Sequence, residues 1–155
     1  MDNVNVIRVG FQTPDFRISD TVGEIDNPIN KSGRKFTCLL FINPDDLGYS
    51  IMKNLENGLP NTASGFKVTL SPVIPVKPRL AKGFKARLDF ETRFFCDSDL
   101  RVGRLFSVVD SSQARPSYHP AVFIIGEDGS VRYRQNISPD GMDIKLLRLE
   151  VGKLS

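Results

Sequence analysis

The sequence predicts an α/β fold in which a central mixed sheet is flanked by helices and preceded by an N-terminal β-hairpin. Segments rich in β-branched and aromatic residues alternate with segments whose apolar residues fall four positions apart, the patterns of strands and helices in turn. The run 35–42 (KFTCLLFI) is apolar enough for a strand buried on both faces. Near the C-terminus, runs at 121–125 and 131–135 flank a glycine turn, which predicts two antiparallel strands.

The first half of the chain predicts a hairpin, a strand and a helix. Alternating apolar and polar residues at 15–19, followed by the turn 21–24, predict the hairpin. After the strand 35–42, the segment 43–46 (NPDD) has the composition of a helix start. Apolar residues then fall four apart along 47–59 and predict one buried helix face.

The middle of the chain repeats this alternation. We expect a strand at 66–70, an extended proline-rich loop at 72–78 and an amphipathic helix at 78–88, in which Leu80, Phe84 and Leu88 form the apolar face. A third strand at 90–96 precedes Asp97-Ser98-Asp99, which is expected to cap a short helix at 100–106.

The C-terminal part predicts a β-hairpin and a closing helix. Gly126-Glu127-Asp128-Gly129 is expected to be the hairpin turn, because two carboxylates are too few for a calcium site. Ser138-Pro139-Asp140 predicts the start of a helix that runs to about residue 151, with proline in its first turn.

Length and composition place further bounds. With 155 residues, the chain is expected to form one domain, 1–155. Its net charge of +3 is mild. It contains no apolar run of about 20 residues that would span a bilayer. No continuous apolar segment of a signal peptide is present near the N-terminus, so we expect a cytoplasmic location. One histidine and two cysteines far apart predict neither a metal site nor a disulfide, and no cofactor is expected.

Four stretches in chain order carry a family resemblance: Val9-Gly10 with Thr13-Pro14-Asp15-Phe16, then Leu39–Pro44, then the strand ends Ser71-Pro72 and Asp97-Ser98-Asp99, and last Val122–Gly129. Together they resemble the peroxiredoxin (AhpC/TSA, redoxin) branch of the thioredoxin-fold superfamily. The resemblance implies a thioredoxin-like fold of the peroxiredoxin type and points toward the oxidoreductases.

The same resemblance implies that the peroxide-reducing site is degenerate. The family motif P-x-x-x-T-x-x-C supplies a shielding proline, an orienting hydroxyl and a thiolate at a helix start, where unpaired N–H groups favour the anion. Pro44 matches the proline, but Gly48 stands at the threonine position and Ile51 at the cysteine position. Ser50 beside it is a poor nucleophile without an activating base. The family's arginine position falls on Pro120.

Pro120 also matches the cis-proline of thioredoxin itself, which predicts a cis bond between His119 and Pro120. His119 is most simply a surface residue, although a role as a proton carrier stays open. The loop edge near Pro44 and Pro120 is a candidate surface for a homodimer or another protein partner.

Three functions stay open at this point. The first is a binding module of this family without peroxidase activity. The second is a thiol-dependent oxidoreductase that uses Cys96, although Asp97 and Asp99 are expected to raise the pKa of that thiol. The third is binding of an anion or a nucleic acid through the helix 77–88, which carries the basic residues Lys77, Arg79, Lys82, Lys85 and Arg87. Of these two ligands nucleic acid is not the one expected, because no aromatic residues are interleaved with these charges for base stacking.

Overall fold

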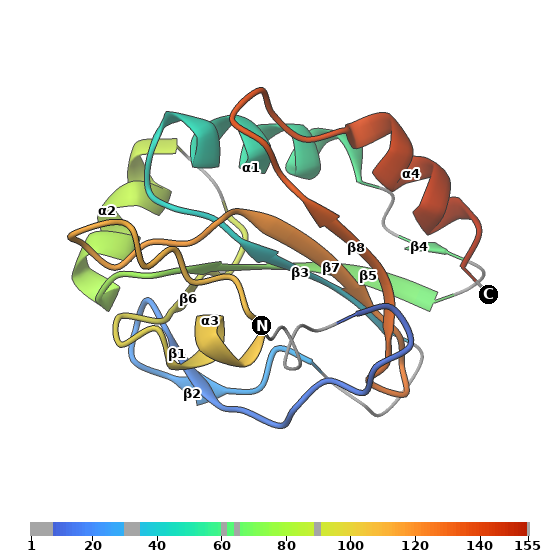
Figure 1. The fold of residues 1–155 in the computed structure, drawn as a ribbon, viewed down its shortest axis with the longest axis horizontal. Helices are drawn as coiled ribbons and strands as arrows, with labels where there is room; N and C mark the ends of the chain where they lie inside the picture. Colours follow the sequence, from blue (N-terminus) through green and yellow to red (C-terminus); the bar gives the residue numbers. More distant parts are fainter. Residues whose placement is uncertain (1–7, 30–34, 60–61, 64–65, 89–90, 155) are drawn as a thin grey trace.

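The computed structural model describes residues 8–29, 35–59, 62–63, 66–88 and 91–154. Within these residues no helix is long and apolar enough to cross a membrane. The described chain folds around one mixed β-sheet, with helices on both of its faces (Figure 1).

The sheet has the strand order β2-β1-β6-β5-β3-β7-β8, and β4 pairs with the first two residues of β5. β3, β5 and β6 are parallel, whereas β1 and β7 run antiparallel to their neighbours. The carboxyl ends of β3, β5 and β6 therefore meet at one edge of the sheet. The strands are β1 Ile18–Asp20, β2 Ile25–Asp26, β3 Lys35–Phe41, β4 Thr62–Ala63, β5 Phe66–Ile74, β6 Phe95–Cys96, β7 Ala121–Ile125 and β8 Val131–Asn136.

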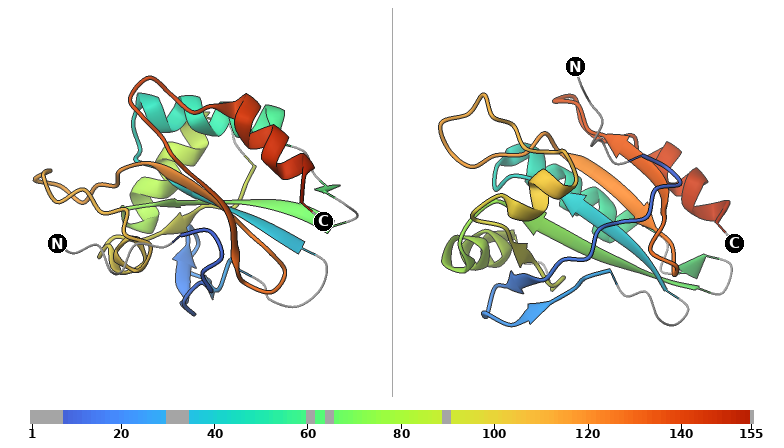
Figure 2. Two further views of the ribbon diagram at one scale, coloured as in Figure 1. Left: turned by 45° about the vertical axis from the view of Figure 1, so that its right-hand side comes forward. Right: turned by 60° about the horizontal axis from the view of Figure 1, so that its bottom comes forward.

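The four helices of the described residues are α1 Asp46–Gly58, α2 Pro78–Leu88, α3 Arg101–Leu105 and α4 Ile144–Gly152. The first, second and fourth pack on one face of the sheet, and α3 lies with the N-terminal segment on the other (Figure 2). Because β3 is central, its alternate side chains serve both layers. Cys38 and Leu40 point into the layer under α1, and Leu39 and Phe41 point into the layer above α3.

Aspartate side chains cap the N-termini of two helices. The Asp45 side chain accepts a hydrogen bond of 2.8 Å from the Gly48 N–H at the start of α1. Asp143 accepts one of 3.0 Å from the Leu146 N–H at the start of α4. Each bond satisfies an N–H group that the first helical turn leaves without a backbone partner.

Arg93 ties the N-terminal hairpin to the sheet. Its Nε and Nη1 atoms lie 3.0 Å from Asp20 and 2.9 Å from Asp26, and its guanidinium lies over the Phe95 ring. Burial would raise the pKa of Asp20, but hydrogen bonds from the Val22 and Glu24 N–H groups and from Arg93 outweigh it and hold the pKa below its ordinary value. The hydrogen bond from Arg93 likewise lowers the pKa of Asp26.

The structure confirms the predicted hairpin at the N-terminus, the strands at 35–42, 121–125 and 131–135, and the helices near 47–59, 78–88 and 100–106. The turn between β7 and β8 is also as expected: the Gly129 N–H donates to the Gly126 carbonyl, and Gly129 has a φ of 83°, which glycine adopts without strain.

Three boundary predictions were wrong. Pro72 continues β5 opposite Leu40 instead of starting a loop, and it lies just before Val73, where pairing with β6 begins. Proline is tolerated in a strand at a position where the backbone N–H would have no hydrogen-bond partner in the sheet. Of the predicted strand 90–96 only β6 forms, with residue 90 outside the described residues. The segment 138–141 is a turn closed by the Gly141 N–H and the Ser138 carbonyl, so α4 begins later, at the Asp143 cap.

The apolar face of α2 also differs from the prediction. Ala81 and Phe84 are buried under the helix, but Leu80 is 62% exposed. Leu88 belongs to the helix, but its side chain lies outside the described part.

Candidate ligand-binding cleft

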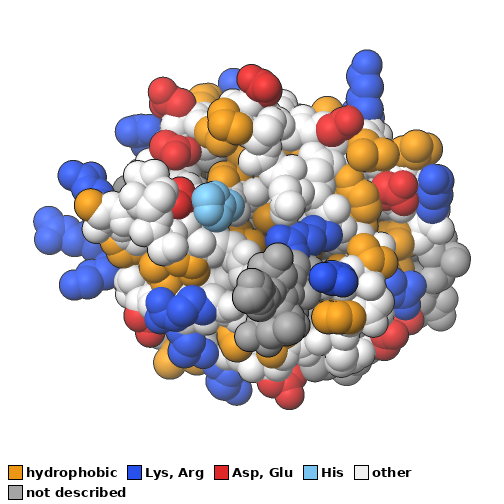
Figure 3. All heavy atoms as spheres, in the orientation of Figure 1, with side chains coloured by type: hydrophobic (Ala, Val, Ile, Leu, Met, Phe, Trp, Pro, Cys, Tyr) orange, Lys and Arg blue, Asp and Glu red, His pale blue; other side chains and the backbone are white. Residues whose placement is uncertain are grey.

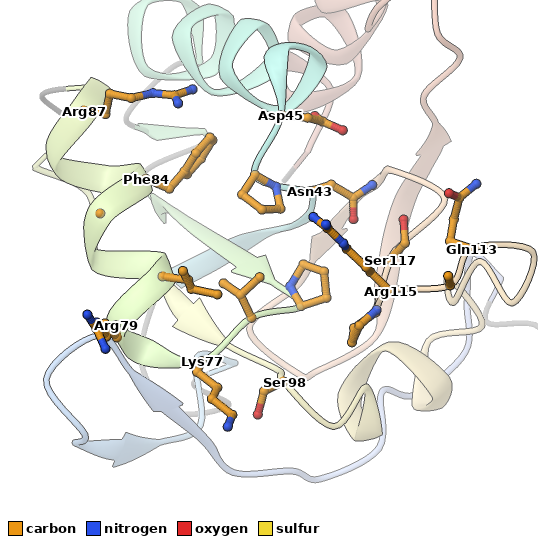
Figure 4. A pocket seen from close by; sticks show the side chains of 17 residues that line it. Asn43, Asp45, Lys77, Arg79, Phe84, Arg87, Ser98, Gln113, Arg115 and Ser117 are labelled. Atoms are coloured by element: carbon orange, nitrogen blue, oxygen red, sulfur yellow. The ribbon is translucent and has the colours of Figure 1, made fainter.

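A hollow of about 1100 Å³ lies at the edge where β3 and β5 end. Its walls come from the turn after β3, from the segment that joins β5 to α2, from α2 itself and from the loop 113–117 (Figure 4). In open α/β sheets this edge is where ligands bind, since loops from several strands converge there.

Apolar side chains form much of the cleft's lining. Pro44 and Leu80 are exposed in it, Val76 is half-buried, and Pro75 and Phe84 are buried against the core. The side chains Ser98, Gln113 and Ser117 add neutral polar groups. The cleft thus offers both contact area and hydrogen-bonding groups to a ligand.

Four cationic side chains line the cleft against one carboxylate. Lys77, Arg79 and Arg87 come from α2 and its start, and Arg115 reaches in from the opposite loop (Figure 4). Asp45 is the carboxylate, and one of its oxygens is already engaged in capping α1. Lys and Arg side chains also gather at the left edge of the molecule in Figure 3, where Figure 1 places α2. The cleft is therefore electropositive.

Asn43 fixes the floor of the cleft. Its side-chain amide donates to the Tyr118 carbonyl at 2.9 Å and accepts from the Tyr118 N–H at 2.8 Å. These two hydrogen bonds extend the pairing of β3 and β7 beyond the last backbone pair, Phe41 and Ala121. A side-chain amide here takes the place of a backbone amide. The end of β3 and the chain leaving the 113–117 loop are thereby held together.

A buried polar pair lies behind that floor. The Tyr118 hydroxyl donates to Asp97 Oδ2 at 2.6 Å, and the Asp97 carboxylate also accepts the N–H groups of Val102 and Gly103 at 3.0 and 2.8 Å. The predicted capping of α3 by Asp97 is confirmed. Burial, together with the Asp97 charge, raises the pKa of Tyr118 well above its ordinary value, so its hydroxyl keeps its proton. These contacts position the loop, and neither Asp97 nor Tyr118 lines the cleft.

The structure places four residues of the predicted degenerate site, Pro44, Gly48, Ser50 and Ile51, in different surroundings. Pro44 lines the cleft, and Ser50 is exposed on α1. Ile51 is only 1% exposed and belongs to the core under α1. A Cβ atom at Gly48 would lie 2.0 Å from the Asn43 carbonyl oxygen, so the first turn of α1 has no room there for a larger side chain.

His119 and Pro120 lie outside the cleft, beside a smaller hollow of about 430 Å³. His119 is 71% exposed, and its Nε2 lies 3.6 Å from Asp110 Oδ1. The predicted cis bond was wrong, because the described residues contain no cis peptide. Backbone bonds on both sides of Pro120, from the His119 N–H to Val108 and from the Ile137 N–H to Pro120, continue the extended β7 conformation instead.

Neither cysteine reaches the cleft. Cys38 is fully buried in β3, and burial raises its pKa to about 12. Cys96 is 8% exposed and borders a small hollow that Arg17 and Arg101 also line. Burial first, and the Asp20 charge second, nonetheless raise its pKa to about 11. The expected increase is confirmed in direction, but Asp20 is its charged cause in place of Asp97 and Asp99.

The residues that sequence reasoning missed come from distant parts of the chain. Asn43 was part of a predicted helix start, and Arg115 belonged to no pattern in the sequence. The signal for the cleft was present on α2 alone, where Leu80 interrupts the basic series. Among the described residues, no group of three His, Cys, Asp or Glu side chains could hold a metal ion.

No protein-family model matches the chain, and no curated protein matches it. Solved structures do. A peroxiredoxin-like protein from Aquifex aeolicus superposes with a TM-score of 0.82 at 16% identity, over 97% of this chain and 89% of that one. A thiol peroxidase from Chromobacterium violaceum gives 0.79 at 12% identity, over 96% and 90%. A cysteine-to-serine mutant of PrxQ from Xylella fastidiosa gives 0.75 at 14%, over 94% and 95%.

These likenesses extend over nearly the whole of each chain, although the sequences are only 12–16% identical. They agree with the strand order, with the helices on both faces and with the hairpin that precedes the sheet. The chain therefore has the thioredoxin fold in the form found in peroxiredoxin-like proteins and thiol peroxidases.

Proposed function

We propose that this protein does not reduce peroxides and acts as a binding module, with the cleft at the ends of β3 and β5 as its binding site. One observation carries the proposal. The position that matches the peroxide-reducing cysteine of the family motif is Ile51, an apolar side chain only 1% exposed in the core. Isoleucine has no nucleophilic atom, and a peroxide has no open route to this position.

The surroundings of Gly48 support the same proposal. A hydroxyl-bearing side chain at this position would need a Cβ atom 2.0 Å from the Asn43 carbonyl oxygen, far inside van der Waals contact. The backbone around the start of α1 would have to move to accept the orienting threonine of the motif. The local packing is thus adapted to glycine.

The two thiols give little support to a redox role. A thiol attacks as its thiolate, and at neutral pH a group with a pKa of about 11 is almost entirely protonated. Cys96, the better exposed of the two, also lies outside the ligand-binding cleft. A thiol-dependent oxidoreductase that uses Cys96 is for these reasons the weaker candidate.

The decisive experiment measures hydrogen peroxide consumption by the reduced protein with a thiol reductant, next to an active thiol peroxidase. We expect a rate equal to that of the reductant alone. The Cys38→Ser and Cys96→Ser variants, each alone, serve as controls and should match the unmodified protein. Saturable peroxide consumption that disappears only in Cys96→Ser would overturn the proposal and favour the oxidoreductase.

A further inference from the structure

We propose that the cleft binds an extended acidic peptide segment of a partner protein, which inserts an apolar side chain against Leu80. This inference rests on the proposed binding function and adds the chemical class of the ligand. It follows from three features of the cleft: its charge, the spacing of its cations and the exposure of its apolar side chains.

The charge of the cleft calls for an anionic ligand. Lys77, Arg79, Arg87 and Arg115 face it against the single carboxylate of Asp45. Across the part of the chain that the structure describes, none of these four cations forms an ion pair with a carboxylate. Their charges are available to a ligand from outside, which a complementary partner would use for both orientation and association rate.

The spacing of the cations favours an extended ligand over a compact one. Arg79 and Arg87 lie two turns apart on α2, about 12 Å along the helix axis at 1.5 Å per residue. Arg115 stands on the opposite wall (Figure 4). A single phosphate needs donors that converge on one point, whereas carboxylates along an extended chain, spaced about 3.3 Å per residue, can meet cations that are spread out.

The apolar side chains distinguish a peptide from a nucleic acid. Leu80 is 62% exposed between the cations, and Pro44 and Val76 lie with it in the cleft. Such a patch favours a leucine or phenylalanine side chain of a partner, because burial of apolar surface stabilises the complex. The aromatic ring in the cleft, Phe84, is only 6% exposed and has no open face for a base to stack on.

The test uses a fluorescently labelled peptide in which glutamates flank a central Leu-Phe pair, and its affinity is measured by anisotropy. We expect binding that weakens as salt rises, because the Debye length falls from about 10 Å at 0.1 M to about 3 Å at 1 M. A second peptide with glutamine in place of every glutamate should bind at least about tenfold more weakly.

Matched variants locate the binding site. Arg79→Gln, Arg87→Gln and Arg115→Gln should each weaken binding by about two- to fivefold, the range for an exposed ion pair. Lys82→Gln removes the same charge from the same helix outside the cleft and should leave the affinity unchanged. Leu80→Ser should weaken binding by about tenfold, and Leu149→Ser, a comparably exposed leucine on α4, should not.

Three outcomes would overturn the inference. Equal losses in Lys82→Gln and Arg79→Gln would mean general attraction to a basic surface. Equal affinity for the glutamine peptide would remove the role of charge. Tighter binding of a single-stranded oligonucleotide or of ATP than of the acidic peptide would assign the cleft to another ligand class. Any of these, without peroxide consumption, would leave the loss of peroxidase activity standing, whereas peroxide consumption would refute that part of the proposed function.

Discussion

Gly48→Ala should destabilise the protein although alanine is the better helix former. A Cβ atom at this position would lie 2.0 Å from the Asn43 carbonyl oxygen and 3.2 Å from its carbon, both of them backbone atoms that cannot rotate away. Replacing glycine by alanine in a helix ordinarily stabilises by about 1 kcal/mol. Forcing an extra methyl group into closely packed surroundings costs about 1–3 kcal/mol or more. Because the contact is with backbone atoms, the upper end of that cost applies, and subtracting the gain leaves a net loss of about 2 kcal/mol in the free energy of unfolding.

Gly83→Ala is the matched control, because nothing lies within 4 Å of a Cβ atom at that position in α2. It should stabilise by about 0.5–1 kcal/mol. Urea unfolding followed by circular dichroism measures the free energy of unfolding of both variants. In thermal unfolding, their melting temperatures should move in opposite directions by about 2–4 °C per kcal/mol. If Gly48→Ala is as stable as Gly83→Ala, the start of α1 has room for a larger side chain, and the packing argument against the peroxide-reducing site fails.

Three further predictions concern the buried groups and the hairpin. Tyr118→Phe removes a hydrogen bond to a carboxylate and should destabilise the protein by about 1.5–3 kcal/mol in urea unfolding. Asp97→Ala should destabilise it more, because it also removes the hydrogen bonds to the first turn of α3. A smaller loss in Asp97→Ala than in Tyr118→Phe would contradict the role given to the Tyr118–Asp97 pair. Asp20 and Asp26 have lowered pKa values in the folded state, so their contribution to the free energy of unfolding is complete above the ordinary aspartate pKa of about 3.9 and is lost as pH falls through and below it. Arg93→Gln should therefore make the free energy of unfolding less dependent on pH between about 4 and 2. An unchanged pH profile would show that Arg93 does not lower the pKa values of the two aspartates. Cys96 should react with a disulfide reagent at pH 8 at least about 100-fold more slowly in the folded protein than in urea, since a pKa of about 11 leaves about 0.1% thiolate; comparable rates would mean an accessible, ionised thiol.

Local patterns predicted much of the fold because they depend on neighbours in the sequence. The apolar run that became β3, the four-residue spacing of Ile51 and Leu55 on α1, and the glycines between β7 and β8 all report burial or backbone geometry directly. The resemblance to peroxiredoxins added the thioredoxin-like arrangement of these elements, which no local pattern contains.

The errors and omissions arose where distant residues decide. Pro72 signals a break locally, but its place before the pairing with β6 lets the strand continue. The segment after Ser138 had the composition of a helix start, yet the cap that forms is Asp143. The cleft itself joins Arg115 to Arg79 and Asn43 to Tyr118, which are separated by dozens of residues and approach only through the arrangement of the sheet.

The wall that carries Arg115 can change without disturbing the rest of the protein. Residues 111–116 are all exposed, so none of their side chains supports either core layer. The base of the wall is closed by the pairing of Val109 with Tyr118 and by the hydrogen bond from the Asp110 N–H to the Ser117 carbonyl. Insertions or exchanges between these closing residues would change the shape and charge of this wall while the folding stability is preserved, because surface loops tolerate such changes.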